Sequence, residues 1–391
     1  MSTQPKKARR AADESAALSE YLRPHLGAMI NLIRDLVEYE SPSQNKHAVD
    51  ELGQYLADVF RGAHARVTMH WNERFGDHLQ ADFDGESGNR ILLLGHHDTV
   101  WDVGTLKTMP FRQESGRIFG PGVLDMKTGI VQALFAIDAL RAIHGKLPRP
   151  VTVLSVTDEE VSSESSRPIT ERIAKESAAV FVLEPSFGPH GALKTARKGV
   201  GDYTVRVNGK AAHAGLDPTK GANAIVELSR QLLKIEKFTD LKNGITVTPG
   251  IIRGGTRTNV VPAEASCDID IRISKPAQSA ILEKKFRALK PINAGCTIEV
   301  EGGVNRPAME RTAAIARLFK LARQLGAETG LKLKEAMVGG GSDGNFTAAL
   351  GVPTLDGLGA VGEGAHATHE SVLIDQLIPR TVLLARLIGE A

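Results

Sequence analysis

Several features that define other classes of protein are scarce in this chain of 391 residues. Two cysteines, Cys267 and Cys296, cannot build a framework of disulfide bonds, and free thiols fit a reducing compartment such as the cytoplasm. No apolar run approaches the roughly 20 residues that a membrane-spanning helix needs. The 48 basic and 46 acidic residues leave a net charge of only +2, which argues against a nucleic-acid-binding surface. We therefore expect a cytoplasmic protein with neither a membrane nor a nucleic acid as its partner.

The chain has ample material for globular domains. Hydrophobic residues make up 42% of the sequence, and 391 residues exceed the size of one ordinary core, so two domains are expected.

Three short apolar runs each end in side chains that can bind metal ions. Such runs are typical of buried strands in a parallel sheet, and ligands collect beyond the carboxyl ends of these strands. The pattern therefore predicts a functional site at that edge of the sheet. The runs and the residues that follow are Ile91–Leu94 before Gly95-His96-His97-Asp98, Val151–Val156 before Thr157-Asp158-Glu159-Glu160, and Ala179–Leu183 before Glu184-Pro185.

Helix and strand patterns alternate in the first part of the chain, which predicts an α/β fold with a mostly parallel sheet flanked by helices. The helices are expected at about Glu20–Glu40, Ala48–Phe60 and Gly129–Ile143, and an additional strand at Ala65–His70.

The alternation of helices and strands changes between residues 198 and 305, where the predicted order β-α-β-β-α-β indicates a ferredoxin-like α+β domain. We expect it to be inserted into the larger domain, with residues 1–197 before it and 306–391 after it. Its predicted elements are Tyr203–Val207, Ala222–Lys237, Ile245–Ile252, Glu264–Ile273, Pro276–Leu289 and Cys296–Glu301. The α/β rhythm then resumes with a helix at Ala313–Thr329 and a strand at Val352–Leu355.

The side chains at the strand ends suit the hydrolysis of an amide bond. Two divalent ions about 3.5–4 Å apart can activate a water and polarise a carbonyl group. Imidazole and carboxylate ligands suit zinc, with cobalt or manganese as substitutes. The candidate ligands are His96, Asp125, Glu160, Glu184 and one of two late histidines, His366 or His369.

Some of these acidic residues also have an interpretation that involves no metal ion. Asp98 faces the same side of an extended chain as His96 and could hold its second ring nitrogen. Asp125 could instead be a carboxylate at a helix N-terminus. Glu159 and Glu160 diverge at a strand end, so one could bind metal while the other acts as a general base, although an acidic pair is commonly a solvated turn. We interpret Asp158 and Glu164 as such solvated residues.

Taken together, these residues resemble the di-zinc metallopeptidase family that contains carboxypeptidase G, aminoacylase, acetylornithine deacetylase and succinyl-diaminopimelate desuccinylase. The glycine-rich stretches Gly339–Gly344 and Asp356–Gly359 are most similar to the glutamate carboxypeptidase branch. The matching motifs, in the order of the family, are Gly95–Val100, Gly120–Lys127, Thr157–Glu160, Leu183–Pro185, Ala211–Gly215 and Gly364–His366.

The resemblance implies a zinc-exopeptidase-like fold with two zinc ions per chain and a role for each matching position. Asp125 would bridge both ions, Glu159 would be the general base and Asp98 would orient His96. His366 is preferred to His369 because the family's last histidine precedes a glutamate by several residues, as His366 precedes Glu370. The implied ligands are His96 and Glu184 for one ion and Glu160 and His366 for the other.

The inserted domain resembles the family's lid and dimerisation domain, which implies a homodimer. His213 matches a histidine that helps to stabilise the oxyanion in a neighbouring subunit's active site. Asn259 and Arg272 match residues that hold the substrate, and Arg272 suits a free carboxylate, although it could instead pair with Asp268 or Asp270 on its own strand. Gly341 would let backbone approach the substrate closely.

The leading hypothesis is therefore a zinc-dependent hydrolase that releases a C-terminal amino acid, with glutamate favoured, from N-acyl, peptidyl or folate-like conjugates. An N-acyl-amino-acid deacylase or a dipeptidase of the same fold is the main alternative. A metal-binding protein without catalysis would be expected to lack a ligand or the base, and the sequence has them all.

Overall fold

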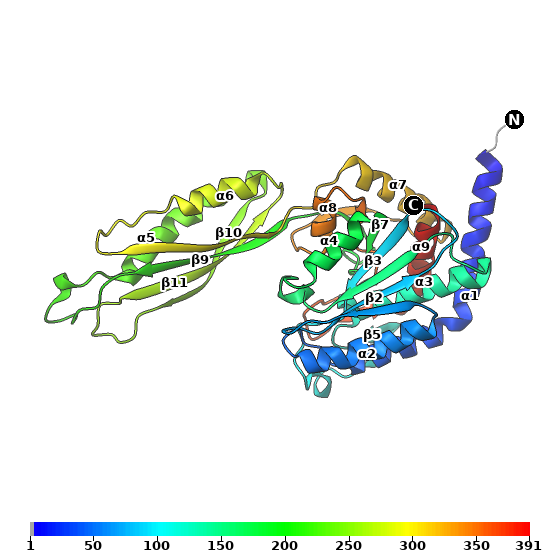
Figure 1. Ribbon diagram of the computed structural model, residues 1–391, viewed down its shortest axis with the longest axis horizontal. Coiled ribbons are helices and arrows are strands. Elements are labelled where there is room, and N and C mark those ends of the chain that lie inside the picture. Colours follow the sequence, from blue (N-terminus) through cyan, green and yellow to red (C-terminus); the bar gives the residue numbers. More distant parts are fainter. Residues whose placement is uncertain (1–3) are drawn as a thin grey trace. The chain divides into compact units, whose positions relative to one another are not determined.

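The computed structural model describes the backbone of residues 4–391 and the side chains from Asp13 onward. The chain divides into two compact units (Figure 1). Unit 2 contains Arg197–Glu310 together with Gly339–Gly341, and unit 1 contains the remaining described residues. The glycine run was expected in the large domain, but Arg197 donates hydrogen bonds from Nη1 to the carbonyl oxygens of Gly340 and Gly341, which ties the run to unit 2.

Unit 1 is built around a six-stranded sheet with the order β1-β2-β6-β3-β7-β14. Strands β6, β3, β7 and β14 are parallel to one another, while β2 pairs antiparallel with both β1 and β6. The predicted mostly parallel α/β sheet is thus confirmed. The strands are β1 (Arg66–His70), β2 (His78–Phe83), β3 (Arg90–His96), β6 (Val151–Val156), β7 (Ser177–Val182) and β14 (Thr354–Leu355).

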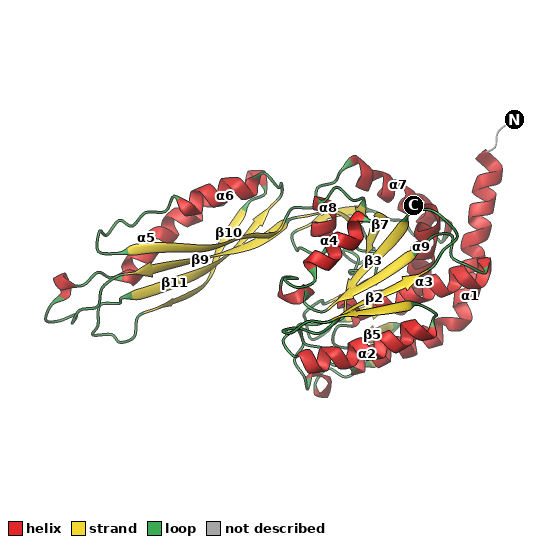
Figure 2. Ribbon diagram, in the orientation of Figure 1, coloured by secondary structure: helices red, strands yellow, loops and turns green. Residues whose placement is uncertain are grey.

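Helices cover both faces of this sheet (Figure 2). Alternate residues of β3 face opposite sides of the sheet. Ile91 and Leu93 belong to the main hydrophobic core, which also contains residues of five helices, while Leu92 and Leu94 belong to a smaller core that contains residues of α4. This two-sided burial explains why the strand is a continuous apolar run. The helices of the main core are α1 (Gln4–Glu38), α2 (Lys46–Gly62), α3 (Thr128–His144), α7 (Ala313–Glu328) and α9 (Leu377–Glu390); the other face has α4 (Arg167–Lys175), and α8 (Gly344–Ala349) contacts α4.

Helix α1 begins much earlier than the expected Glu20. Leu18 is fully buried and continues the apolar stripe by one turn, and Ser15 donates a 2.6 Å hydrogen bond to Glu328. No described helix of the chain combines the length and the apolar character that crossing a membrane would require.

Two smaller sheets complete unit 1, and their strands, of two to five residues, were not predicted from the sequence. One has the order β15-β16-β5-β4 and the other pairs β13 with β8. Their bounds are β4 (Arg112–Glu114), β5 (Arg117–Phe119), β8 (Leu193–Arg197), β13 (Glu335–Val338), β15 (Gly362–Glu363) and β16 (Ser371–Leu373).

Unit 2 has the element order β-α-β-β-α-β and one antiparallel sheet with the order β10-β11-β9-β12 (Figure 2). Alternate residues of β11, such as Cys267 and Ile269, are buried with residues of the two helices in one apolar cluster. Strand β10 lies at the edge of the sheet and is exposed from Thr248 onward. The elements are β9 (Gly199–Asn208), α5 (Ala224–Ile235), β10 (Thr246–Gly254), β11 (Glu264–Ile273), α6 (Gln278–Arg287) and β12 (Thr297–Arg306).

Candidate metal centre

The carboxyl ends of three neighbouring parallel strands bring the predicted ligands of unit 1 together. Strand β3 ends at His96, β7 ends just before Glu184, and β6 is followed by a short turn that carries Glu159 and Glu160. Because β6, β3 and β7 are adjacent, these side chains lie at one edge of the sheet. Asp125 reaches the same edge from the irregular turn that precedes α3.

The two carboxylate oxygens of Asp125 face two different histidines. Its Oδ1 lies 3.3 Å from Nε2 of His96, and its Oδ2 lies 3.5 Å from Nε2 of His366. A carboxylate placed between two imidazoles in this way has the geometry of a bridging ligand.

The other carboxylates complete the cluster around each histidine. Glu184 Oε1 lies 3.6 Å from Nε2 of His96, and Glu160 Oε1 lies 3.2 Å from Nε2 of His366. Ligand atoms of His96, Glu159 and Glu184 lie within 4.8 Å of one another, as do those of His96, Asp125 and Glu160.

Of the two late histidines, the structure brings His366 into the cluster. Its neighbour His369 is exposed and has no hydrogen bond or ion pair among the described residues.

The charges of this cluster favour a bound cation. Burial lowers the pKa of His96, but its contacts with Asp125, Asp98 and Glu184 outweigh burial and raise the pKa well above the usual value. Hydrogen bonds to Asp125 and Glu160 raise the pKa of His366 to about 10. Both imidazoles therefore attract protons strongly, which indicates an excess of negative charge at the centre.

The residues fit a metal centre. A group of imidazoles and carboxylates with converging ligand atoms is the donor set that suits zinc, cobalt or manganese, and a cation would take the place of the protons. The residues that could hold it are His96, Asp125, Glu160, Glu184 and His366.

Asp98 is fully buried behind His96, and its carboxylate also organises the acidic turn. It accepts hydrogen bonds from Ser43 Oγ at 2.7 Å and from the backbone N–H of Glu160 at 3.2 Å. Ser43 could not be recognised from the sequence, because only the folded chain brings the α1–α2 connection to this point.

The interpretation of Asp158 as a solvated residue is wrong. Its side chain is fully buried, and Oδ2 accepts hydrogen bonds from Ser165 N, Ser165 Oγ and Ser166 N, so it shapes the loop that follows Glu159. Glu164 is exposed as expected and pairs with Arg74.

Within unit 2, His213 and Asn259 lie side by side. Residue 213 forms a bridge with Val260, and the N–H of Ala214 donates to the carbonyl oxygen of Asn259. Nδ1 of His213 accepts hydrogen bonds from the N–H groups of Gly215 and Leu216, both at 3.1 Å, so the ring proton sits on Nε2.

Arg272 pairs with its strand neighbour Asp270 through Nε and Nη2, the latter at 2.7 Å. Its Nη1 lies 3.5 Å from the carbonyl oxygen of Gly339. Asp268 pairs instead with Arg253 at 2.7 Å. A side chain on Gly341 would meet Arg306 and Val200 at 2.9 Å, so this position leaves no room for a larger residue.

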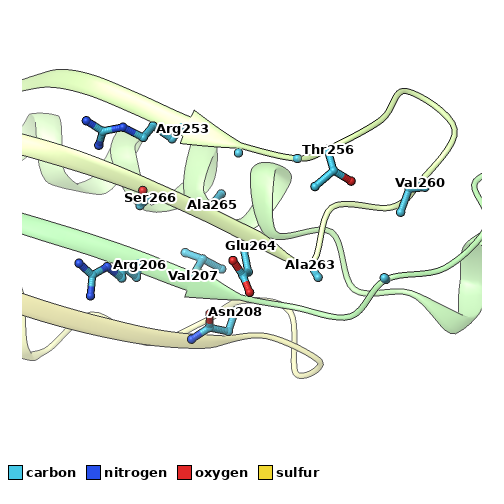
Figure 3. Close-up of a pocket in the computed structure, with 13 residues that line it drawn as sticks. Arg206, Val207, Asn208, Arg253, Thr256, Val260, Ala263, Glu264, Ala265 and Ser266 are labelled. Carbon is cyan, nitrogen blue, oxygen red and sulfur yellow. The ribbon is translucent and has the colours of Figure 1, made fainter.

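A cavity in unit 2 lies where β9 and β10 end and β11 begins (Figure 3). Its polar lining includes Asn208, Glu264 and Thr256, and its two arginines are already paired, Arg206 with Glu301 and Arg253 with Asp268. It contains none of the candidate site residues.

Like Ser43, Glu370 was not recognised from the sequence as part of the site. Glu370 is fully buried and accepts hydrogen bonds from the loop that carries Asp125. In the sequence Glu370 served only to distinguish the two late histidines, and a single glutamate in a polar segment carries no pattern that predicts these backbone contacts.

Comparisons with known proteins find relatives along most of the chain. Residues 92–390 match Peptidase family M20/M25/M40. The chain is 30% identical to carboxypeptidase G2 from Pseudomonas sp. (strain RS-16) over 365 residues, which cover 92% of this chain and 88% of that protein. It is 29% identical to acetylornithine deacetylase from Edwardsiella ictaluri over 300 residues, covering 70% and 75% of the two chains.

Solved structures share the fold. Aminopeptidase PepT from Bacillus cereus has a TM-score of 0.76 at 21% identity, covering 93% of this chain and 98% of its own. The M20 family metallo-carboxypeptidase Sso-CP2 from Sulfolobus solfataricus has a TM-score of 0.72 at 16% identity, with 93% and 99% covered. The chain therefore belongs to Peptidase family M20/M25/M40 and is a metallopeptidase, a metal-dependent hydrolytic enzyme.

Proposed function

We propose that this metallopeptidase holds two zinc ions and cleaves an amide bond to release a C-terminal amino acid, with glutamate as the favoured product. The observation that carries the proposal is the position of Asp125, whose two oxygens face His96 and His366 at 3.3 and 3.5 Å. This is the arrangement that a bridging carboxylate needs. Cobalt or manganese could replace zinc with the same ligands.

In this proposal, Glu159 is the general base. Zinc ions, when bound, would polarise the substrate carbonyl and activate the attacking water. Glu159 lies in the ligand cluster without being needed as a ligand, so it can remove a proton from the water and deliver it to the leaving amine. The buried Asp98 orients the ring of His96.

Unit 2 would supply groups that hold the substrate. Nε2 of His213 carries the ring proton and can donate to an oxyanion in the active site of a partner copy. Asp270 fixes the guanidinium of Arg272, whose Nη1 could bind the free carboxylate of the substrate. Asn259 lies beside His213, and Gly341 stands where there is no room for a side chain. These two residues would complete the part of the site that holds the substrate.

We further propose a homodimer that forms through unit 2. Edge strand β10 presents unpaired backbone groups, and Ile251 and Ile252 on it are 53% and 59% exposed. The β10 strand of a second copy would pair with these backbone groups and cover the two exposed isoleucines. Cys267 and Cys296 are free and buried, which suits a reducing cytoplasm as the place of action.

A substrate panel tests the proposed activity. Zinc-loaded protein would be offered N-acyl amino acids and dipeptides that end in glutamate, aspartate or neutral residues, together with folate, and the released amines would be identified by mass spectrometry. Selective release of glutamate would support the carboxypeptidase proposal. Release of mainly neutral amino acids would favour an N-acyl-amino-acid deacylase or a dipeptidase instead.

A further inference from the structure

Glu370 is a fully buried carboxylate whose two oxygens accept four hydrogen bonds. Oε1 accepts from the backbone N–H groups of Leu124 at 2.8 Å and Asp125 at 3.0 Å. Oε2 accepts from the backbone N–H of Gly122 at 3.0 Å and from the indole Nε1 of Trp101 at 2.8 Å. An ionised carboxylate has about four lone-pair sites, so these four donors saturate it.

All four partners of Glu370 are donors, so the carboxylate can only accept. Burial raises the pKa of Glu370, while the hydrogen bonds from the three backbone groups and Trp101 act in the opposite direction. A neutral amide at this position would place an NH₂ group against two of the donors in either orientation, because one end of an amide cannot accept.

The same glutamate belongs to the turn that presents His366. This turn is closed by hydrogen bonds from Ala367 N to Gly364 O and from Glu370 N to Ala367 O, both at 2.8 Å. His366 itself has a left-handed φ of 61°, and its side chain is 50% exposed. Little packing therefore fixes the imidazole, and the anchored end of its turn lies at Glu370.

We propose that Glu370 is a positioning residue for the metal centre, because it joins the loop of Asp125 to the turn of His366 and sets the distance between these two ligands. The inference rests on the proposed metal-binding roles of Asp125 and His366.

The two ion positions should depend on this residue unequally. His96 is 1% exposed, lies at the end of a central strand and contacts Asp98 as well as the carboxylates. At the position formed by Glu160 and His366, Asp98 holds only the backbone N–H of Glu160, and the half-exposed His366 relies on the turn that Glu370 anchors. Loss of the anchor should therefore weaken the second position more than the first.

Titration of the metal-free protein with Co²⁺, followed by calorimetry and by the visible absorption of the bound ion, tests this inference. In the wild-type protein we expect two ions per chain. In Glu370→Gln we expect one of the two affinities to fall by about 10–100-fold and the absorption spectrum to change, since outer-shell substitutions have effects of this size.

Glu227→Gln is a matched control. Glu227 is also fully buried and accepts hydrogen bonds from two backbone N–H groups, those of Ile292 and Asn293 at 2.9 Å, and from Gln231, but it lies in unit 2. This variant should lower the melting temperature without changing either affinity. If Glu370→Gln does the same, Glu370 has a structural role only and the inference is wrong.

Trp101→Phe provides a second variant in case Glu370→Gln does not fold. It removes only the indole donor and should weaken the same ion position to a smaller extent, so unchanged binding would overturn the inference. If the wild-type protein does not bind two ions, the proposed function fails first, which separates that outcome from a failure of the role of Glu370.

Discussion

Asp98 contacts the imidazole of His96 through two of its atoms. Its backbone carbonyl oxygen lies 2.9 Å from Nδ1 of His96, and its Oδ1 lies 3.4 Å from the same nitrogen. Acceptors on this side keep the ring proton on Nδ1 when the imidazole is neutral, which leaves the lone pair of Nε2 directed toward Asp125 and Glu184. The backbone contact would survive a change of the side chain, so Asp98 cannot act on His96 through its carboxylate alone.

Replacing Asp98 by alanine should therefore weaken metal binding without abolishing it. The variant loses the carboxylate that contacts His96 and accepts from the N–H of Glu160. We expect the metal affinity to fall by about 10–100-fold in a calorimetric titration. Ser43→Ala removes only one hydrogen bond to Asp98 and should have a smaller effect. Equal affinities for Asp98→Ala and the wild type would contradict the orienting role.

Replacing Glu159 by glutamine should lower turnover strongly while leaving the metal content near that of the wild-type protein. The change removes the proposed base but not the proposed ligands, and proton transfer of this kind contributes about 10²–10⁴-fold to a rate. Amine release and elemental analysis of the same sample would measure both. Glu164→Gln is the control, because this nearby glutamate is exposed and should be dispensable. A Glu159→Gln enzyme with normal turnover would exclude the assignment.

The central part of the fold could be predicted because its signals are local. Strand β3 is a continuous apolar run, and β11 alternates over ten residues, so both the type and the position of these strands follow from their own residues. Strands β15 and β16 have two and three residues, too few for a pattern, so only their pairing defines them, β15 with β16 and β16 with the distant β5.

The same distinction applies to the candidate site. His96 and Glu184 could be predicted because each follows an apolar run that ends at the correct edge of the sheet. Asp158 and Glu370 could not, because their partners are mostly backbone N–H groups, and these have no signature in the sequence. A buried carboxylate that is satisfied by backbone donors is indistinguishable in the sequence from an exposed one.

Replacing His213 by alanine should lower kcat by about 10²–10³-fold if its Nε2–H stabilises the oxyanion. The hydrogen bonds to Nδ1 leave Nε2 as the donor, and the side chain is exposed, so the variant should remain folded. The rate and the mass of the assembly in light scattering would be measured together. His213→Asn keeps a side-chain donor and should recover part of the rate. An unchanged rate with alanine would remove His213 from the mechanism.

Gly122 should not tolerate a side chain. Its φ is 70°, and an added Cβ would lie 2.6 Å from Cγ2 of Thr99. Gly116 provides a matched control, since its φ is 77° but a Cβ there would meet nothing within 4 Å. In chemical denaturation, Gly116→Ala should cost about 1–2 kcal/mol for the left-handed backbone, and Gly122→Ala clearly more. Equal losses of stability in the two variants would mean that the loop of Gly122 shifts to make room beside Thr99.

Metal binding at pH 8 should release protons from the two histidines of the centre. Contacts with Asp125 and Glu160 raise the pKa of His366 to about 10, so this ring is protonated at pH 8 in the metal-free protein, and contacts with Asp125, Asp98 and Glu184 also raise the pKa of His96 above its usual value. A metal ion must displace these protons, and its apparent affinity should therefore increase as the pH rises toward 10. Histidines with an ordinary pKa of about 6.5 would release almost no protons on metal binding at pH 8. Calorimetry in buffers with different ionisation enthalpies counts the protons. We expect His366→Ala to release about one proton per chain fewer than the wild type, whereas a release near zero in the wild type would show that the carboxylates do not hold these protons.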